Sequence, residues 1–422
     1  MKTTPVAMIL ALTGLINGCR TAPPEIYQWR GTNRNGIFPE TGLLEQWPEG
    51  GPGLLWTFEG LGRGYAGPVV TGDQIFIMGE EEGNSWLFSL DMEGQLQWRS
   101  PNGKAFLGEG FSSTYPGARS TPTVVGNMVY ATSGQGNIGC FDTSTGKELW
   151  SRNITGDLGG MVTEFGYTES LAADGKVVYC FPGGTVNNVV ALNRFSGKVV
   201  WTSEAVRDTF AYGSPIPVDL PENKVLVVTG RHHLFTLDRA TGQLLGSYPL
   251  EGFEYDGEHC NTVVFANGHL HFVANDIPGQ GSTRLKISPD GREITEVWRN
   301  PGVLNNFGGL VVVDGYLFTM VKGNRLVKLD PGTGMVTDSL KVATGSIIYA
   351  DNKFFCYGNN GTVNLVRYRN GTLEEAGELK VAGGTGHHFS HPVIAGGVMF
   401  IRRGDALMAY RVGEQATPLN QE

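Results

Sequence analysis

A motif of roughly 45 residues recurs along most of this 422-residue chain. Its clearest copy, Ser120–Trp150, contains an apolar strand, a tight turn, two further strands, an Asp, a Thr-Gly turn and a Trp. The Asp-like position recurs at intervals of 51, 51, 45 and 92 residues, at Asp91, Asp142, Asn193, Asp238 and Asp330. The last interval spans two repeats and predicts a degenerate copy, which lies at Leu285–Trp298. Such a period indicates similar units that stack to share a core.

Each repeat is predicted to form one four-stranded antiparallel blade. Pairs such as Gly126-Asn127 and Asp314-Gly315 tolerate the positive φ of two-residue hairpin turns. The first strands of the units fall near Ala66, Thr121, Glu169, Ser214, Thr262, Gly309, Ile347 and His391. Because one blade cannot bury both faces alone, the sequence predicts an all-β, eight-bladed β-propeller over residues 51–414.

The last unit shows only three strands, so the ring needs one more. Leu54–Phe58 has the pattern of a fourth strand but no blade before it. We therefore predict that this N-terminal strand joins the C-terminal blade, which also removes an exposed sheet edge. The recurring Trp and Asp are interpreted as fold residues: the Trp fills the gap between blades and the Asp closes a turn.

The N-terminus is interpreted as a targeting segment. Lys2 precedes an apolar run, Val6–Ile16, that matches a signal-peptide core and is too short to span a bilayer. The run Ile16–Cys19 resembles a bacterial lipobox. We expect a signal peptide over residues 1–18, lipidation of Cys19, an extension over 19–50 and a C-terminal tail over 415–422, with a plain secretory signal as the alternative. The protein is then an exported, membrane-anchored lipoprotein that faces the periplasm or the cell surface.

Charge and cysteine usage exclude several classes of function. The net charge is −9 and no block of Lys and Arg occurs, which argues against a nucleic-acid partner. The other four cysteines, Cys140, Cys180, Cys260 and Cys356, fall in separate repeats. Their spacing fits neither a disulfide framework nor a zinc site, so we expect buried free thiols. We expect a monomer whose only membrane contact is the lipid anchor.

The segment Asp142–Trp150, DTSTGKELW, resembles the tryptophan-docking repeat of the pyrroloquinoline-quinone-like β-propeller family, the quinoprotein alcohol dehydrogenase-like superfamily. The resemblance covers roughly residues 51–412, and the opening Trp29–Gly36 is similar to uncharacterised exported bacterial lipoproteins of this family. The family includes dehydrogenases that use pyrroloquinoline quinone (PQQ) and calcium. It also includes the non-enzymatic lipoprotein of the outer-membrane β-barrel assembly machinery. The dehydrogenases' adjacent cysteine pair is absent from this chain, and no local motif matches their Glu, Asn and Asp.

Polar and aromatic residues cluster where the first strands begin, and these points converge on the axial channel of a propeller. The candidates for a ligand-binding funnel are Arg63, Tyr65, Arg119, Glu169, Tyr212, Asp256, Glu258, His259, Asn306, His388 and His391. The alternative is a hydrated channel whose polar groups satisfy one another. We predict no metal site, because adjacent strand residues such as His387 and His388 point to opposite faces. No catalytic residues are assigned.

We therefore predict a binding or scaffold module at the cell envelope rather than an enzyme. Its expected partner is an envelope protein or a polar small-molecule or carbohydrate ligand. One alternative is an oxidoreductase that depends on PQQ with calcium or on another metal, similar to alcohol or sugar dehydrogenases. A second alternative is a carbohydrate-binding accessory protein, since the aromatic funnel residues could stack on sugars, namely Tyr65, Tyr167, Tyr212 and Phe307.

Overall fold

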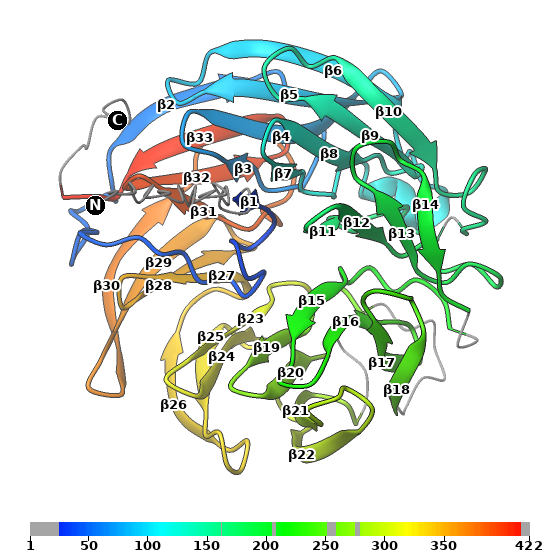
Figure 1. The fold of residues 1–422 in the computed structure, drawn as a ribbon. Helices are drawn as coiled ribbons and strands as arrows, with labels where there is room; N and C mark the ends of the chain where they lie inside the picture. Colours follow the sequence, from blue (N-terminus) through cyan, green and yellow to red (C-terminus); the bar gives the residue numbers. More distant parts are fainter. Residues whose placement is uncertain (1–24, 162, 205–207, 251–258, 275–278, 415–422) are drawn as a thin grey trace, which may run out of the picture.

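The computed structural model describes residues 25–161, 163–204, 208–250, 259–274 and 279–414. The described residues form eight antiparallel sheets arranged as blades around one axis (Figure 1). Their helical content is a 3-10 turn at Gly110–Thr114. The predicted all-β, eight-bladed propeller is confirmed. In the described part of the chain no helix has the length and apolarity that a membrane crossing requires.

The first four blades, from the axis outward, are β3 (Val69–Val70), β4 (Gln74–Glu81), β5 (Asn84–Asp91) and β6 (Leu96–Lys104); β7 (Thr123–Val125), β8 (Met128–Thr132), β9 (Asn137–Asp142) and β10 (Glu148–Asn153); β11 (Ala172–Asp174), β12 (Val177–Cys180), β13 (Val190–Asn193) and β14 (Val199–Thr202); and β15 (Ile216–Asp219), β16 (Lys224–Thr229), β17 (His233–Asp238) and β18 (Leu244–Pro249). Each blade follows the predicted hairpin order.

The last four blades are β19 (Val264–Ala266), β20 (His269–Val273), β21 (Ser282–Ile287) and β22 (Ile294–Asn300); β23 (Leu310–Val313), β24 (Tyr316–Val321), β25 (Arg325–Leu329) and β26 (Val336–Lys341); β27 (Gly345–Ala350), β28 (Lys353–Gly358), β29 (Thr362–Arg369) and β30 (Thr372–Lys380); and β31 (Val393–Ala395), β32 (Val398–Arg403), β33 (Ala406–Arg411) and β2 (Leu54–Glu59). The strand β2 pairs with β33 from Leu54↔Tyr410 to Glu59↔Ala406, so the predicted closure of the ring is confirmed. In Figure 1 these two segments lie side by side although they come from opposite ends of the chain.

A tryptophan on the outer strand of one blade bonds to the turn of the next blade. The indole N–H of Trp150 donates to the carbonyl of Arg194 at 2.9 Å, and Trp56, Trp98, Trp201 and Trp298 make the equivalent bond. The Gly of the turn is required because the ring covers it. A Cβ on Gly197 would lie 2.6 Å from the Trp150 ring. The inferred structural role of the Trp is confirmed.

The Asp of each turn holds the turn closed, as predicted. Asp142 Oδ1 accepts the backbone N–H groups of Ser144 and Thr145 at 3.1 and 3.0 Å. Hydrogen bonds from Ser144 and Thr145 keep the pKa of the Asp142 carboxyl below its ordinary value. Immediately after this turn the outer strand carries a β-bulge, between Glu148 and Trp150, and a register shift occurs in the outer pair of every blade. Bulges increase the local twist that lets neighbouring sheets fan around an axis.

The segment over residues 25–50, called the plug below, is part of the propeller. Its first strand, β1 (Ile26–Tyr27), pairs with Val124–Val125 of β7, at the end of that inner strand away from Thr121. The plug then crosses the axis, because the backbone of Ile37 forms a β-bridge with Tyr349 of β27 and the backbone N–H of Trp47 donates to the carbonyl of Ala376 in β30. The predicted extension over 19–50 therefore lies, over its described part, inside and across the ring (Figure 1). Cys19 and the tail over 415–422 lie outside the described residues.

Candidate functional site

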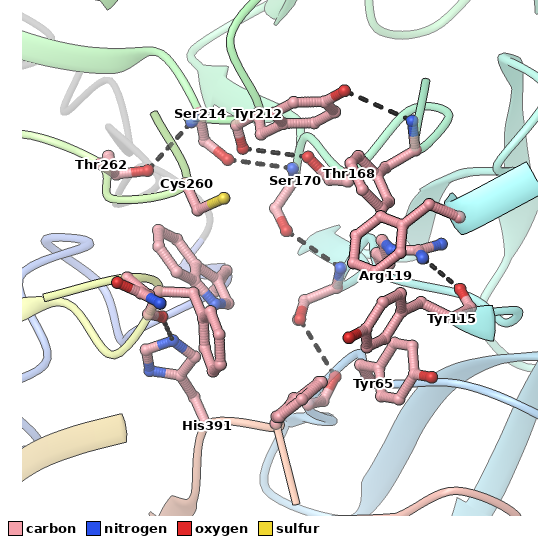
Figure 2. Close-up of a pocket in the computed structure, with 18 residues that line it drawn as sticks. Tyr65, Tyr115, Arg119, Thr168, Ser170, Tyr212, Ser214, Cys260, Thr262 and His391 are labelled. Atoms are coloured by element: carbon pink, nitrogen blue, oxygen red, sulfur yellow. Dashed lines mark hydrogen bonds between the residues drawn. The ribbon is translucent and has the colours of Figure 1, made fainter. Parts of the chain in front are cut away.

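A pocket of about 340 Å³ opens on the axis at the ends where the first strands of the blades begin (Figure 2). Its lining comes from seven blades, their connecting loops and the plug. It consists of Trp29, Tyr65, Gly67, Phe111, Tyr115, Arg119, Thr121, Phe165, Thr168, Ser170, Tyr212, Ser214, Cys260, Thr262, Asn306, Phe307, Phe389 and His391. This volume suits a small ligand.

The plug closes the axial channel beneath the pocket. Trp29 lines the pocket, and the neighbouring Arg30 is fully buried on the axis. The Arg30 guanidinium donates to the carbonyls of Leu310 and Ile347, which belong to two different blades. A Cβ on Gly309 would lie 2.3 Å from an Arg30 nitrogen, so only glycine fits beside this side chain. Burial lowers the pKa of Arg30 to about 10, which leaves it charged at neutral pH.

A second arginine of the plug, Arg34, is equally buried. It donates to the carbonyls of Ser170 and Leu171 and to the side-chain oxygen of Gln28. Burial lowers its pKa to about 10, and the nearby Glu169 opposes that shift. Burial raises the pKa of Glu169 itself to about 8, so this carboxyl is mostly protonated at neutral pH. Glu169 therefore offsets only a small part of the positive charge of Arg34.

His391 is held as a neutral ring. Arg30 donates to its Nδ1 at 3.3 Å, which requires a lone pair on that nitrogen, and Nε2 faces the Phe307 carbonyl at 3.3 Å. Nε2 must then carry the proton. Burial and the charge of Arg30 lower the pKa of His391 to about 3. This imidazole positions the plug and does not exchange protons near neutral pH.

Three hydroxyl groups form a belt on one wall of the pocket. The backbone N–H of Thr121 donates to Ser170 Oγ at 2.9 Å, that of Ser170 to Ser214 Oγ at 3.0 Å, and that of Ser214 to Thr262 Oγ1 at 2.9 Å. Figure 2 shows this blade-to-blade chain. Within the described part of the protein the hydroxyl protons of Ser170, Ser214 and Thr262 have no acceptor. This hydroxyl belt therefore presents three hydrogen-bond donors to a ligand.

An aromatic mouth surrounds the entrance. Its rings, which contact one another at centroid distances of 4.7–6.4 Å, belong to Tyr65, Phe111, Tyr115, Phe165, Tyr212, Phe307 and Phe389. Aromatic side chains lose little conformational entropy on binding and offer flat apolar surface. The pocket thus has an apolar rim above a polar belt.

Arg119 is the one charged side chain that the described residues contribute to the pocket lining. Its guanidinium donates to the carbonyls of Gly117 and Tyr115 and lies 5.5 Å from the Tyr65 ring centroid. No carboxylate of the described chain forms an ion pair with it. Glu80, which interacts electrostatically with Arg119, is buried, and burial raises its pKa to about 7. Glu80 is then about half ionised at neutral pH and offsets only part of the charge of Arg119, so the described lining residues carry a net positive charge.

The structure brings five of the predicted funnel residues to the pocket: Tyr65, Arg119, Tyr212, Asn306 and His391. Others lie elsewhere. Arg63 is exposed and its backbone forms an antiparallel β-bridge with the backbone of Glu80, whereas His259 is buried against Phe272. His388 donates to or accepts from Tyr357 Oη at 2.7 Å. Asp256 and Glu258 lie outside the described residues.

Strand geometry explains why Glu169 and His388 do not line the pocket. Successive residues of an extended segment point to opposite faces. Thr168 and Ser170 face the pocket, so Glu169 turns into the protein, where its Oε2 accepts the N–H of Phe181 at 2.8 Å. Likewise, the rings of His387 and Phe389 stack on each other, and Phe389 lines the pocket. His388, which lies between them in the sequence, points the other way. The predicted cluster of charged groups is thus replaced by hydroxyls and aromatic rings.

Sequence reasoning missed Trp29 and the hydroxyl belt. Residues that precede a proline at the start of a first strand, namely Gly67, Thr121, Ser214 and His391, all line the pocket. This signal marks Ser214 of the belt, but neither Ser170 nor Thr262 precedes a proline. Of the cysteines, Cys140, Cys180 and Cys356 are buried and unpaired as expected, whereas Cys260 is partly exposed at the pocket.

The lining does not fit PQQ with calcium. Calcium takes six to eight oxygen ligands, usually including carboxylates. The pocket lining contains no Asp or Glu among the described residues, and no group of three or more His, Cys, Asp or Glu side chains in them could hold a metal. The donor set favours a metal-free, acceptor-rich ligand.

A closed ring of eight four-stranded blades with tryptophan-docking turns defines a PQQ-like β-propeller. One family within this class matches the chain. The model of the family described as outer membrane protein assembly factor BamB matches residues 54–203 and 185–350. The chain belongs to this family.

Individual relatives are distant. The BamB of Kangiella koreensis is 26% identical over 225 residues, which cover 51% of this chain and 52% of the relative. That of Moranella endobia is 25% identical over 272 residues, which cover 59% of this chain and 64% of the relative. The chain thus matches between half and two thirds of the length of these curated relatives.

Solved structures share the fold. BamB from Moraxella catarrhalis superposes with a TM-score of 0.60 at 11% identity, over 86% of this chain and 99% of that one. Quinohemoprotein alcohol dehydrogenase from Comamonas testosteroni gives a TM-score of 0.60 at 14% identity, over 86% and 77%. One propeller architecture therefore serves both an assembly factor and an enzyme, and the site must decide between them.

Proposed function

We propose that this protein is a non-catalytic binding propeller of the bacterial cell envelope, anchored through Cys19 and docked on an envelope protein. The observation that carries the proposal is the match to the assembly-factor family over residues 54–350. The pocket adds support, because its lining is aromatic, hydroxylic and singly charged, which suits recognition. Exposed apolar side chains on the loops near the mouth, Leu107, Phe111 and Met161, offer contact area for a protein partner.

The test uses the full-length tagged chain in its host. We expect mild cross-linking and purification from membranes to recover an outer-membrane assembly complex, and Cys19→Ser to release the protein from the membrane fraction. Leu107→Asp should reduce recovery of the complex, whereas Val199→Asp, an apolar position of similar exposure on an outer strand, should not. Recovery of no reproducible complex, or equal effects of the two substitutions, would contradict the proposal.

A second candidate, carbohydrate binding, is favoured by the aromatic mouth above the hydroxyl belt. Sugars combine apolar ring faces with polar ring edges, and this pocket offers a surface for each. The oxidoreductase alternative has a direct test: titration with PQQ and calcium should give no spectral shift and no dye reduction with alcohols or sugars.

A further inference from the structure

The described residues of the axial pocket contribute more positive than negative charge and an excess of hydrogen-bond donors. Arg119 lines it, and the guanidinium groups of Arg30 and Arg34 lie 5.6 and 5.9 Å from the Trp29 ring centroid behind it. None of the three forms an ion pair with a described residue, and their donors are directed mainly at carbonyls. Carbonyls satisfy hydrogen bonds but leave the net charge in place. A ligand that enters this field gains by being anionic.

The position of the hydrogen-bond donors indicates that the ligand has acceptor atoms in addition to its negative group. The hydroxyl belt crosses three neighbouring blades, so its donors spread along the wall and not at one point. A plain aromatic acid would place an apolar ring edge against these hydroxyls and leave them without acceptors. An unsatisfied buried polar group costs about 1–3 kcal/mol. The ligand must therefore carry oxygen atoms around its ring as well as a negative group.

The remaining surface is apolar. Trp29 and the aromatic mouth supply ring surface on the plug side and at the entrance. A ligand with oxygen around its edge, C–H groups on its faces and one carboxylate matches all three parts of the pocket. Acidic sugars have this chemistry.

We propose that the axial pocket binds a uronic acid, whose carboxylate meets Arg119, whose ring oxygens accept from the hydroxyl belt and whose ring packs against Trp29 and the aromatic mouth. The inference rests on the proposed binding role and deepens it by naming a ligand class. It also assigns the plug a function, because Trp29 completes the site from the far end of the channel. The same chemistry is offered by a free uronate and by a uronate at the end of a glycan, and the probes below distinguish the two.

Titration calorimetry on the full-length chain in detergent, at low salt and neutral pH, tests the proposal. The probes are D-glucuronate, D-galacturonate and D-mannuronate, with D-glucuronamide as the uncharged analogue and phenylacetate as the acid without ring oxygens. Oligosaccharides that end in the preferred uronate distinguish a glycan end from the free sugar. We expect at least one uronate to bind about tenfold or more tightly than either control compound, as a charge-assisted bond predicts.

Variants locate the interaction. Arg119→Gln should remove the preference for uronate over its amide, and Ser214→Ala should weaken both sugars. Arg99→Gln is the matched control, since Arg99 also stacks on an aromatic ring, at 4.7 Å from the Trp86 centroid, but lies outside the pocket. Circular dichroism confirms that each variant is folded.

Three outcomes would overturn the inference: no uronate binding at millimolar concentration, tighter binding of phenylacetate, or an unchanged preference in a folded Arg119→Gln protein. Recovery of an envelope complex without uronate binding would remove the ligand assignment alone. Uronate binding without a complex would remove only the docking role.

Discussion

The rim and the axis of the propeller are built in opposite ways. At the rim, one contact is repeated from blade to blade: a Trp indole donates to the turn of its neighbour, over a glycine that the ring covers. At the axis, the buried contacts of Arg30 and Arg34 each occur once and join segments far apart in the chain. The repeat therefore encodes the fold, whereas single side chains encode the site.

The largest effect is expected at the axis. Arg30→Ala removes charge-assisted bonds to Leu310 and Ile347 and leaves a cavity, so the free energy of unfolding should fall by about 3–5 kcal/mol in urea titrations. Arg30→Met keeps most of the volume and should cost less. If Arg30→Ala lowers the free energy of unfolding by less than about 1 kcal/mol, the contacts of Arg30 do not stabilise the axis more than the repeated contacts stabilise the rim.

A smaller effect is expected at the rim. Gly146 has φ +69° and a Cβ there would lie 2.5 Å from the Trp98 ring, so Gly146→Ala should destabilise the protein by about 2–3 kcal/mol. Gly175 has φ +55° and open space around it, so Gly175→Ala should cost only about 1 kcal/mol. If Gly146→Ala and Gly175→Ala lose the same stability in thermal and urea unfolding, docking of the Trp does not need the glycine.

A pH effect separates the axis from the rim. The carboxyl of Glu169 titrates near 8 in the folded protein, because burial raises its pKa from 4.5. Between these values the folded state holds a proton that the unfolded state has lost, so stability falls as pH rises. Buried histidines such as His391, whose pKa is lowered from 6.5 to about 3, act in the opposite direction, most strongly below pH 6.5 and with little effect above about pH 7.5.

We therefore expect the free energy of unfolding to decrease by about 1 kcal/mol between pH 7 and 8.5, where the contribution of the histidines is small. Glu80, with a pKa of about 7, adds to the slope in the lower part of this window. Glu169→Gln should flatten much of the slope, and Glu148→Gln, an exposed rim residue, should not. A slope unchanged by Glu169→Gln in urea titrations at several pH values would show that the carboxyl is already ionised in the fold.

The smallest effect is expected for an exposed ion pair on the rim. Arg99 and Glu81 lie 3.3 Å apart and both are about half exposed. Arg99→Gln should change the free energy of unfolding by less than about 1 kcal/mol, because solvent screens the pair. A larger loss would disqualify Arg99→Gln as a control for Arg119→Gln.

Much of the rim could be read from the sequence. The Asp, Thr-Gly and Trp of one repeat lie within nine residues, so their turn and its hydrogen bonds are local. The closing strand Leu54–Phe58 was also predictable, because a ring of repeats with one strand missing leaves one place for it. Four of the nine funnel candidates that the structure describes do not line the pocket. The placement of Glu169 and His388 in the funnel was wrong, because a shift of one residue along a strand reverses the side-chain direction.

The sequence by itself determined the eight blades, their turns and the tryptophan docking, because each depends on residues that are neighbours in one repeat or in adjacent repeats. Only the tertiary structure decided that Trp29, Arg30 and Arg34 cross the axis to close the pocket. Their partners, such as Leu310 and Ile347, are about 300 residues away in the chain. No local pattern specifies such a contact, because it arises only when the ring has closed and its inner carbonyls converge.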